Sequence, residues 1–326
     1  MNFHIVGFGL AGALLAWELR KLGAHVTFED DADKESSSRV AAGMITPITG
    51  KRLKPTWQRE TLTTLALDTY RDIEVAYSVQ LVRCWWLRRV FREEIQNEWF
   101  LQRCQNGEYN GIHVKSIPPG AYNDVQFPYG GFEHDGVYTV DITTLIDTLR
   151  NSISGETEPR APFITVHCTG HKALLNEHWR WLPLEPSKGE ILDVRIPGLA
   201  LDHILTNGTW ILPMGNNLYR IGATHDWDDQ SPEPTKHGRE QLLAAARELT
   251  SAPIEVTRQR AAIRPSTKFK RPIVGIHPVH GQHAIFTGLG TKGALQGPWA
   301  ARVLARHLVL NEPLNAEINV LRWYTQ

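Results

Sequence analysis

Residues 3–30 of the chain read FHIVGFGLAGALLAWELRKLGAHVTFED. The apolar start of this stretch, residues 3–6, predicts a strand, and Gly7, Gly9 and Gly12 place a GxGxxG turn directly after it. Apolar residues at helical spacing over residues 13–22 predict a helix that ends at a glycine. Residues 25–28 predict a second strand, so the chain opens with a βαβ unit.

This βαβ unit predicts a dinucleotide site. The first glycine of such a turn permits the sharp bend, the second lets backbone approach a pyrophosphate, and the third allows close packing of helix on strand. The phosphates would lie at the helix N-terminus, and an acidic residue ending the second strand would bind the ribose. We prefer Asp30 to its neighbour Glu29, because Asp30 is nearer the usual spacing of about 20 residues. The motif alone leaves open a turn that binds no nucleotide. The expected contacts of this unit are Gly7, Gly9, Leu10, Ala11, Gly12, Glu29 and Asp30.

Composition argues against several other classes of protein. The 326 residues include 35 basic and 35 acidic side chains, a balance that does not favour a nucleic acid or an anionic membrane as partner. Three scattered cysteines, Cys84, Cys104 and Cys168, predict neither a disulfide framework nor a metal site. The start of the chain lacks a signal-peptide pattern, and no segment is apolar over the ~18–20 residues of a membrane span. A cytoplasmic protein is expected. A basic cluster (Arg83, Arg88, Arg89 and Arg92) is interpreted as part of a half-buried element with a solvated face.

The remaining pattern predicts an α/β fold with two domains. Further strands of the doubly wound type are expected at 163–169 and 284–287, and helices at 56–77, 141–151 and 298–309, with Asp141 as a helix cap. The intervening material is rich in strand-like segments around one good helix at 239–249. We therefore expect a discontinuous Rossmann-type domain from residues 1–78, 141–176 and 263–326. A mixed-sheet domain, residues 79–140 and 177–262, would be inserted in it.

Five stretches, in order, resemble one known family. They are SSSRVAAGM (36–44), VHCTG (166–170), PSKGE (186–190), IGAT (221–224), and IRP (263–265) followed by GLGTKG (288–293). Together they resemble the D-amino-acid oxidase and glycine oxidase family of FAD-dependent oxidoreductases, whose fold is of the D-amino-acid oxidase/glutathione-reductase type. The resemblance implies FAD on the Rossmann-type domain and a substrate-binding inserted sheet. Because no cysteine lies in the C-terminal third, the FAD is expected to be non-covalent.

The resemblance also implies roles for individual residues. Arg264 would pair with a substrate carboxylate through its planar fork, whereas without the family it would be interpreted as a surface arginine. Lys292 would lie beside the flavin, with a solvated loop lysine as the alternative. No histidine is assigned a role. The further FAD contacts implied are Ser37, Ser38, Arg39, Ala42, Gly43, Met44, Thr169, Gly170, Gly288, Gly290, Thr291, Lys292, Gly293 and Ala294.

By resemblance, the activity would be oxidation of a small amine or amino acid by hydride transfer to flavin N5, giving an imine. The substrate would be a small molecule, with neither nucleic acid nor membrane as partner, and self-association stays open. One alternative is a tRNA-modifying oxidoreductase, since a related branch removes a carboxymethyl group from a wobble uridine and has a similar Thr291-Lys292-Gly293 loop. Another is a flavin-binding protein without turnover. The chain departs from the family in two places. The crossover between residues 152 and 163 is short, although relatives contact the adenine there. The C-terminal loop carries Thr291-Lys292 where the similar glycine oxidases carry Arg-Asn.

Overall fold

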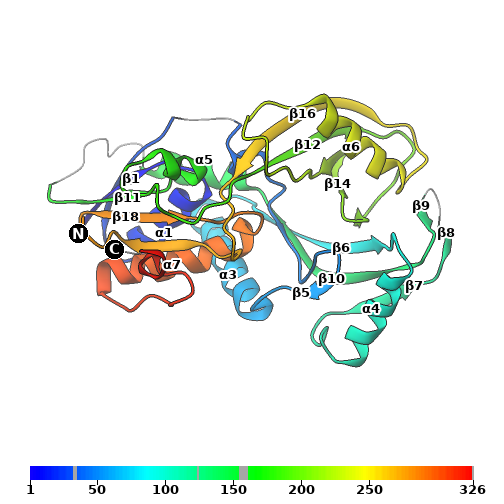
Figure 1. The fold of residues 1–326 in the computed structure, drawn as a ribbon, viewed down its shortest axis with the longest axis horizontal. Coiled ribbons are helices and arrows are strands. Elements are labelled where there is room, and N and C mark those ends of the chain that lie inside the picture. The colour runs from blue at the N-terminus through cyan, green and yellow to red at the C-terminus, as the bar shows by residue number, and fades with distance from the viewer. Residues whose placement is uncertain (32–34, 123–124, 154–160, 325–326) are drawn as a thin grey trace.

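The chain folds around two sheets that lie side by side (Figure 1). The structure is a computed structural model that describes residues 1–31, 35–122, 125–153 and 161–324. A five-stranded sheet has the order β17-β18-β11-β1-β2. Its neighbours are parallel except for β17, which runs antiparallel to β18. These strands are β1 (Asn2–Val6), β2 (His25–Glu29), β11 (Ile164–His167), β17 (Ile273–Ile276) and β18 (His283–Thr287).

Long helices pack on one face of this sheet, where they bury the apolar side chains that alternate along the strands. Phe3 and Ile5 of β1 are buried among them, whereas the alternate residues Asn2, His4 and Val6 are only half-buried on the other face. Helix α1 packs on α7, and Leu14 and Leu15 of α1 are fully buried. No helix of the described residues is long and apolar enough to cross a lipid bilayer. The helices of this layer are α1 (Leu10–Lys21), α3 (Arg59–Tyr77), α5 (Ile142–Ile153) and α7 (Gly293–Leu310).

A nine-stranded sheet forms the other half of the molecule, with the order β16-β12-β15-β14-β13-β6-β10-β3 and β7 paired to β10. Helix α6 (Lys236–Arg247) covers its outer face through Leu242 and Ala246. Its inner face packs on Val40, Ala42 and Met44, which follow the first βαβ unit. These strands are β3 (Met44–Ile45), β6 (Val82–Val90), β7 (Val114–Ile117), β10 (Gly131–Val140), β12 (Ser187–Arg195), β13 (Ile204–Thr206), β14 (Trp210–Gly215), β15 (Leu218–Gly222) and β16 (Glu255–Arg264).

The remaining elements are short, apart from α4 (Ile95–Gln105), which buries Phe100 in an aromatic cluster against the far end of the nine-stranded sheet. They are α2 (Ser37–Val40), η1 (Gly170–Leu175), η2 (Val320–Trp323) and two small ribbons, β4 (Ile48–Thr49) with β5 (Lys54–Pro55) and β8 (Gly120–Tyr122) with β9 (Val125–Phe127).

Three features differ from what the sequence pattern predicted. Helix α7 begins at Gly293 rather than at residue 298, so that Pro298 lies inside it. Helix α4 falls in the intervening material where strand-like segments and a single helix at 239–249 were expected, because its sequence carries no clear apolar periodicity. Met44 and Ile45 pair with β10 of the nine-stranded sheet, although they lie in the range assigned to the Rossmann-type domain.

Candidate functional site

The GxGxxG turn has the geometry that a phosphate-binding loop requires. Gly7 has φ +92°, and a Cβ there would lie 2.8 Å from the Cys168 carbonyl oxygen. A Cβ on Gly12 would lie 2.2 Å from the Gly7 carbonyl oxygen. At Gly9, by contrast, the nearest atom to a Cβ would be the Ser38 Oγ, 3.0 Å away, in another segment. Gly7 and Gly12 are therefore required for packing, and Gly9 leaves room at the start of α1.

The serine run reaches this same loop. Ser38 Oγ accepts a hydrogen bond from the Leu10 amide at 3.0 Å, which brings α2 against the first turn of α1. Arg39 is held differently, since its guanidinium bonds the Asp147 carboxylate of α5 at 3.3 Å. Gly43 has φ +64°, and its carbonyl accepts from the Val140 amide at 3.0 Å. Ser38 thus lies beside the predicted phosphate loop, whereas the Arg39 side chain is engaged elsewhere.

The two acidic residues after β2 have different environments. One Asp30 oxygen accepts from the Phe8 amide at 2.9 Å, and the other pairs with Arg150, so that its side chain is only 15% exposed. Glu29 ends β2, and its side chain is 63% exposed. The ribose contact stays a prediction. For that contact Glu29 offers the more accessible carboxylate, because both oxygens of the Asp30 carboxylate already bind the Phe8 amide and Arg150.

A surface depression of about 540 Å³ begins at this end of the sheet. Glu29 and Thr169, two of the predicted contacts, line it together with Val6, His167 and Lys172. Gly170, next to Thr169, has φ +60°, and its carbonyl accepts from the Thr287 hydroxyl at 2.9 Å. The depression therefore lies where the adenosine half of a dinucleotide would extend. Residues 154–160, part of the short crossover at the place where relatives contact the adenine, lie outside the described residues.

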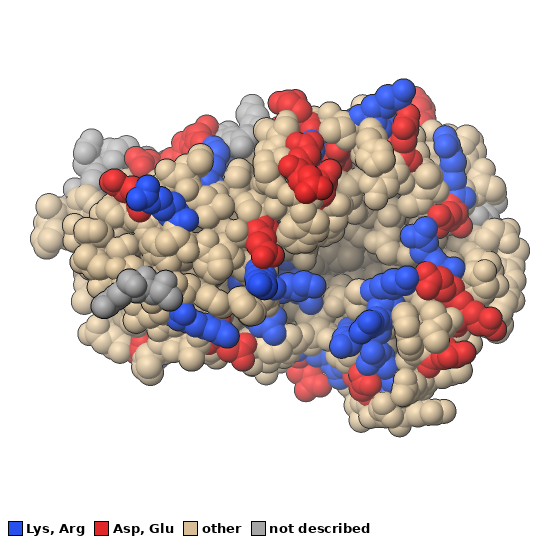
Figure 2. All heavy atoms as spheres, viewed as in Figure 1, with Lys and Arg blue, Asp and Glu red and all other residues tan. Residues whose placement is uncertain are grey.

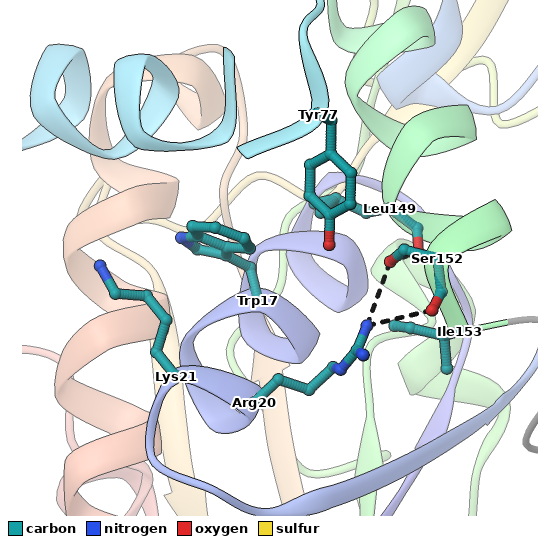
Figure 3. A pocket seen from close by; sticks show the side chains of 7 residues that line it. All are labelled: Trp17, Arg20, Lys21, Tyr77, Leu149, Ser152 and Ile153. Atoms are coloured by element: carbon teal, nitrogen blue, oxygen red, sulfur yellow. Dashed lines mark hydrogen bonds between the residues drawn. The ribbon is translucent and has the colours of Figure 1, made fainter. Parts of the chain in front are cut away.

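A second pocket, of about 250 Å³, lies between the C-terminal ends of α1, α3 and α5 (Figure 3). There the Arg20 guanidinium bonds the Ser152 carbonyl and hydroxyl oxygens, while Trp17 and Tyr77 line the opposite wall. None of the predicted site residues lines this pocket, and it lies at the opposite end of α1 from the phosphate loop.

The C-terminal glycine loop, residues 288–293, leads into α7, and the start of α7 packs against the start of α1. Gly288 and Gly290 have φ +80° and +51°. A Cβ on Gly293 would lie 3.1 Å from the Leu10 side chain, so the two helix N-termini are neighbours. Each N-terminus carries a partial positive charge of roughly +0.5. Thr291 is exposed in this loop, and the Ala294 carbonyl points into the protein, where it accepts from Tyr70.

Lys292 directly precedes α7. Burial, followed by the charges of Arg271 and Lys270, lowers the pKa of Lys292 to about 8. Within the described part of the chain, Lys292 forms no salt bridge. The start of α7 is therefore an electropositive region with an amine whose charge depends on pH near neutrality.

Arg264 is the last residue of β16, and two backbone carbonyls fix the position of its guanidinium. Nη1 donates to the Lys188 carbonyl and Nη2 to the Thr224 carbonyl, each at 3.1 Å. A Cβ on Gly189 would lie 1.9 Å from Nη2, so only glycine leaves room for the guanidinium. Burial lowers the pKa of Arg264 to about 10, and no acidic side chain of the described residues pairs with it. An arginine has five N–H donors, so three remain for a ligand.

Several residues around Arg264 had no assigned role in the sequence. Lys188 is fully buried and bonds Asp229 at 2.6 Å, which makes it part of the scaffold. His225 is close enough to Arg264 that burial, followed by the charges of Arg264 and Lys270, lowers the pKa of His225 to about 4. The loops also meet, since the Gly290 amide donates to the Pro265 carbonyl at 3.1 Å. No local signal marked His225, because only the fold brings it to Arg264.

These features can be compared with known proteins. Residues 131–307, more than half of the chain, match the family of FAD dependent oxidoreductases known as DAO. The chain belongs to this family. A glycine oxidase from Bacillus subtilis is 30% identical over 135 residues, which cover 40% of this chain and 36% of that protein. The tRNA 5-methylaminomethyl-2-thiouridine biosynthesis bifunctional protein MnmC of Idiomarina loihiensis is 28% identical over 148 residues, covering 43% of this chain and 24% of that protein. The chain spans between about a quarter and a third of the length of these curated relatives.

Solved structures show that the DAO-type fold extends over the whole chain. Glycine oxidase from Geobacillus kaustophilus aligns over 99% of both chains with a TM-score of 0.79 at 19% identity. Iminodiacetate oxidase from Chelativorans sp. BNC1 aligns over 98% of both chains with a TM-score of 0.77 at 19% identity. The α/β fold with a Rossmann-type FAD-binding part and a mixed-sheet part is therefore confirmed.

The residues present fit FAD, the cofactor of this family. The space at Gly9, the Ser38 hydroxyl and the first turn of α1 suit a pyrophosphate, because they combine close backbone approach with hydrogen-bond donors. The adjoining start of α7 places positive charge beside the expected path of the flavin.

Proposed function

We propose that this protein oxidises the C–N bond of a small amine or amino acid that carries a carboxylate, with non-covalently bound FAD. The observation that carries the proposal is Arg264, a half-buried arginine with donors free and no acidic partner among the described residues. Bound FAD supplies the two-electron acceptor. Phosphate-loop residues, Ser38 and Glu29 would hold the pyrophosphate and ribose, and the N-terminus of α7 would face the flavin.

Arg264 would orient the substrate. Two backbone carbonyls fix its guanidinium, so the remaining donors keep a constant direction and suit both oxygens of one carboxylate. A carboxylate held this way places the neighbouring carbon and nitrogen in a fixed position, and such positioning is a large part of catalysis in two-reactant sites. Removing Arg264 would therefore affect turnover of carboxylate substrates more than the content of FAD.

The charges around the site would also select the protonation state of the substrate. Arg264, Lys270 and Lys292 contribute positive charge, and the low pKa of His225 keeps that ring neutral at pH 7. Positive surroundings disfavour an ammonium group. They would therefore favour the neutral amine, whose nitrogen lone pair is needed when the C–N bond becomes C=N. The neutral ring of His225 offers a nitrogen that can accept a hydrogen bond from the amine N–H.

Anaerobic reduction of the flavin tests the proposal. The purified protein should be yellow, acid precipitation should release its FAD into the supernatant, and an anaerobic panel should bleach the flavin. The panel contains amino acids, N-methyl amino acids and polyamines, each acid matched with its decarboxylated analogue. Bleaching by an acid but not by its analogue is expected. Preference for the analogue would contradict the role of Arg264, and no bleaching by any compound would leave a flavin-binding protein without turnover.

A tRNA-modifying oxidoreductase is the second candidate, because two similar proteins are described as tRNA biosynthesis proteins. The balanced charge of the chain still predicts weak binding of nucleic acid. Titration with tRNA and with random RNA at several salt concentrations separates the candidates. A tight complex that prefers tRNA, with affinity falling steeply as salt rises, would favour the tRNA reaction over free amines.

A further inference from the structure

Arg89, in β6, is a second arginine with no acidic partner among the described residues, and it is buried. The residue is 9% exposed, and its Nε is buried with no hydrogen-bond partner. Burial lowers the pKa of Arg89 to about 10, and no carboxylate of the described residues forms a salt bridge with it. The next residue on the same strand contrasts with it, since Arg88 is 40% exposed and bonds Glu133 at 2.9 Å.

The strand register places Arg89 on the inner face of the nine-stranded sheet. Arg89 pairs directly with Thr206, and Thr206 with Trp210, so all three side chains share one face. Leu87 and Trp85, two and four residues before Arg89, lie on that face too, and they pack with Ala42 and Met44. Trp85 and Leu87 thus face the segment expected beside the flavin, and Arg89 lies farther along the same face, opposite Phe132 of the aromatic cluster that α4 covers.

Arg264 lies on the same inner face, at the other side of Trp210. Ala262, two residues before Arg264 on β16, packs with Val40 and Ile191, and Trp210 contacts this group. Strands β12, β15, β14 and β13 lie between β16 and β6. At ~4.8 Å per step, the five steps from β16 to β6 place the Cα atoms of Arg264 and Arg89 at least about 24 Å apart along the sheet. Figure 2 shows a hollow between the two halves of the molecule, with Lys and Arg side chains gathered beside it.

A buried and unpaired arginine is costly for a folded protein. The desolvation penalty of one buried ion is several kcal/mol, which a hydrogen-bonded partner of opposite charge offsets. Exposed Arg88 has such a partner and buried Arg89 has none among the described residues. An anion that binds from the inner side would supply the missing partner, and the guanidinium fork matches the oxygens of a carboxylate or phosphate.

We infer that Arg89 binds a second anionic group of the substrate, a carboxylate or phosphate, across Trp210 from the group that Arg264 binds. The separation of the two arginines suits an extended substrate with anionic groups at both ends rather than a compact amino acid. That the anion belongs to the substrate rests on the proposed function, whereas anion binding by Arg89 does not.

Stabilisation of the FAD-loaded protein by inorganic phosphate tests the anion site directly. Phosphate should raise the melting temperature of the parent above that in sodium chloride of equal ionic strength. Arg89→Met should melt higher than the parent without phosphate, because it removes an uncompensated buried charge, and should bind phosphate roughly ten- to a hundredfold more weakly. Arg88→Met, the matched control on the outer face, should keep the full phosphate response.

Two results of the phosphate titration would overturn the inference. One is an equal phosphate response in Arg89→Met and the parent, and the other is a parent that does not respond to phosphate at all. If Arg89→Met instead loses stability without phosphate, Arg89 is a structural residue and the inference also fails. Because none of these measurements needs turnover, they remain decisive even if no amine bleaches the flavin.

Kinetics and competition then identify the source of the anion. Amines with two distant anionic groups should lose kcat/KM roughly ten- to a hundredfold in Arg89→Met, while amines with a single carboxylate should change little. Displacement of phosphate by a short single-stranded RNA, but by no small amine, would assign the group to a nucleic-acid backbone. Equal losses for both amine classes would contradict a separate subsite.

Discussion

At the residue scale, the proposed site depends on two arginines, Arg264, which is half-buried, and Arg89, which is buried. Arg264 and Arg89 both lack acidic partners among the described residues, whereas arginines with structural roles, such as Arg260 on Asp193, are paired. Buried Lys188 is paired as well, with Asp229. The distinction between paired and unpaired buried cations separates scaffold from candidate ligand-binding residues, because an unpaired charge gains its compensation only when a ligand binds.

The first prediction concerns Arg264. Arg264→Met should lower kcat/KM for a carboxylate substrate by roughly ten- to a hundredfold, because it removes hydrogen bonds to a charged group. Arg264→Lys should recover only part of the loss, since a point charge lacks the planar fork. FAD content and the flavin spectrum should stay unchanged. Arg258→Met, an exposed arginine on the same strand, is the control. Equal efficiency of parent and Arg264→Met would show that the residue does not bind substrate.

At the scale of elements, the start of α7 depends on a hydrogen bond from α3. Pro298 has no N–H, so the Ala294 carbonyl, four residues earlier, lacks its usual helical donor. The Tyr70 hydroxyl of α3 donates to this carbonyl at 2.7 Å, and Tyr70 is completely buried. Helix α7 therefore continues through a proline, and its N-terminus stays beside the phosphate loop because another helix supplies the missing donor.

We therefore predict that Tyr70→Phe lowers the free energy of unfolding by about 1–3 kcal/mol, the cost of a buried unsatisfied carbonyl. Urea unfolding of the FAD-loaded protein measures this change. Tyr77→Phe is the control on the same helix, because no hydrogen bond of the Tyr77 hydroxyl is seen in the described structure. Pro298→Ala restores an N–H, so in that background Tyr70→Phe should cost less. Strict additivity of the two substitutions would refute the link.

At the scale of the whole molecule, buried histidines set the response to acid. Burial is the main cause that lowers the pKa values of His134 and His167 to about 4, and the charge of His283, 3.1 Å from His167, adds to the second shift. Unfolded histidines titrate near 6.5. Between pH 6.5 and about 4 the unfolded chain therefore binds protons that the native protein does not. Stability is retained above pH 6.5 and lost as the pH falls toward 4.

The slope of stability against pH tests this statement. Each such histidine should contribute up to about 1.4 kcal/mol per pH unit to the fall in the free energy of unfolding. His134→Asn keeps an N–H for the Asp135 carbonyl, which His134 contacts at 2.8 Å, and should reduce the slope by about one proton. His237→Asn, at an exposed position, should leave the slope unchanged. An unchanged slope in His134→Asn would show that this histidine titrates alike in both states.

The sequence by itself determined the features that depend on neighbours along the chain. The GxGxxG turn, the order of strands and helices around it and the family followed from local patterns, and the structure and comparisons confirm the fold and the family. Asp141 caps α5 as predicted, since its carboxylate accepts from the Thr144 amide at 2.9 Å. Such signals can be read because a turn, a cap or an amphipathic helix is specified within a few residues.

Tertiary structure alone decided which charged residues are candidates for the site. Arg88 and Arg89 are adjacent in sequence, yet the pleat of β6 turns one to solvent and buries the other. Glu29 and Asp30 are also adjacent, but only the fold brings Arg150 and the Phe8 amide onto Asp30. The burial of a charged side chain and its pairing with an opposite charge depend on segments that are distant in the chain. These two properties distinguish a charged residue that supports the fold from a candidate for binding a ligand.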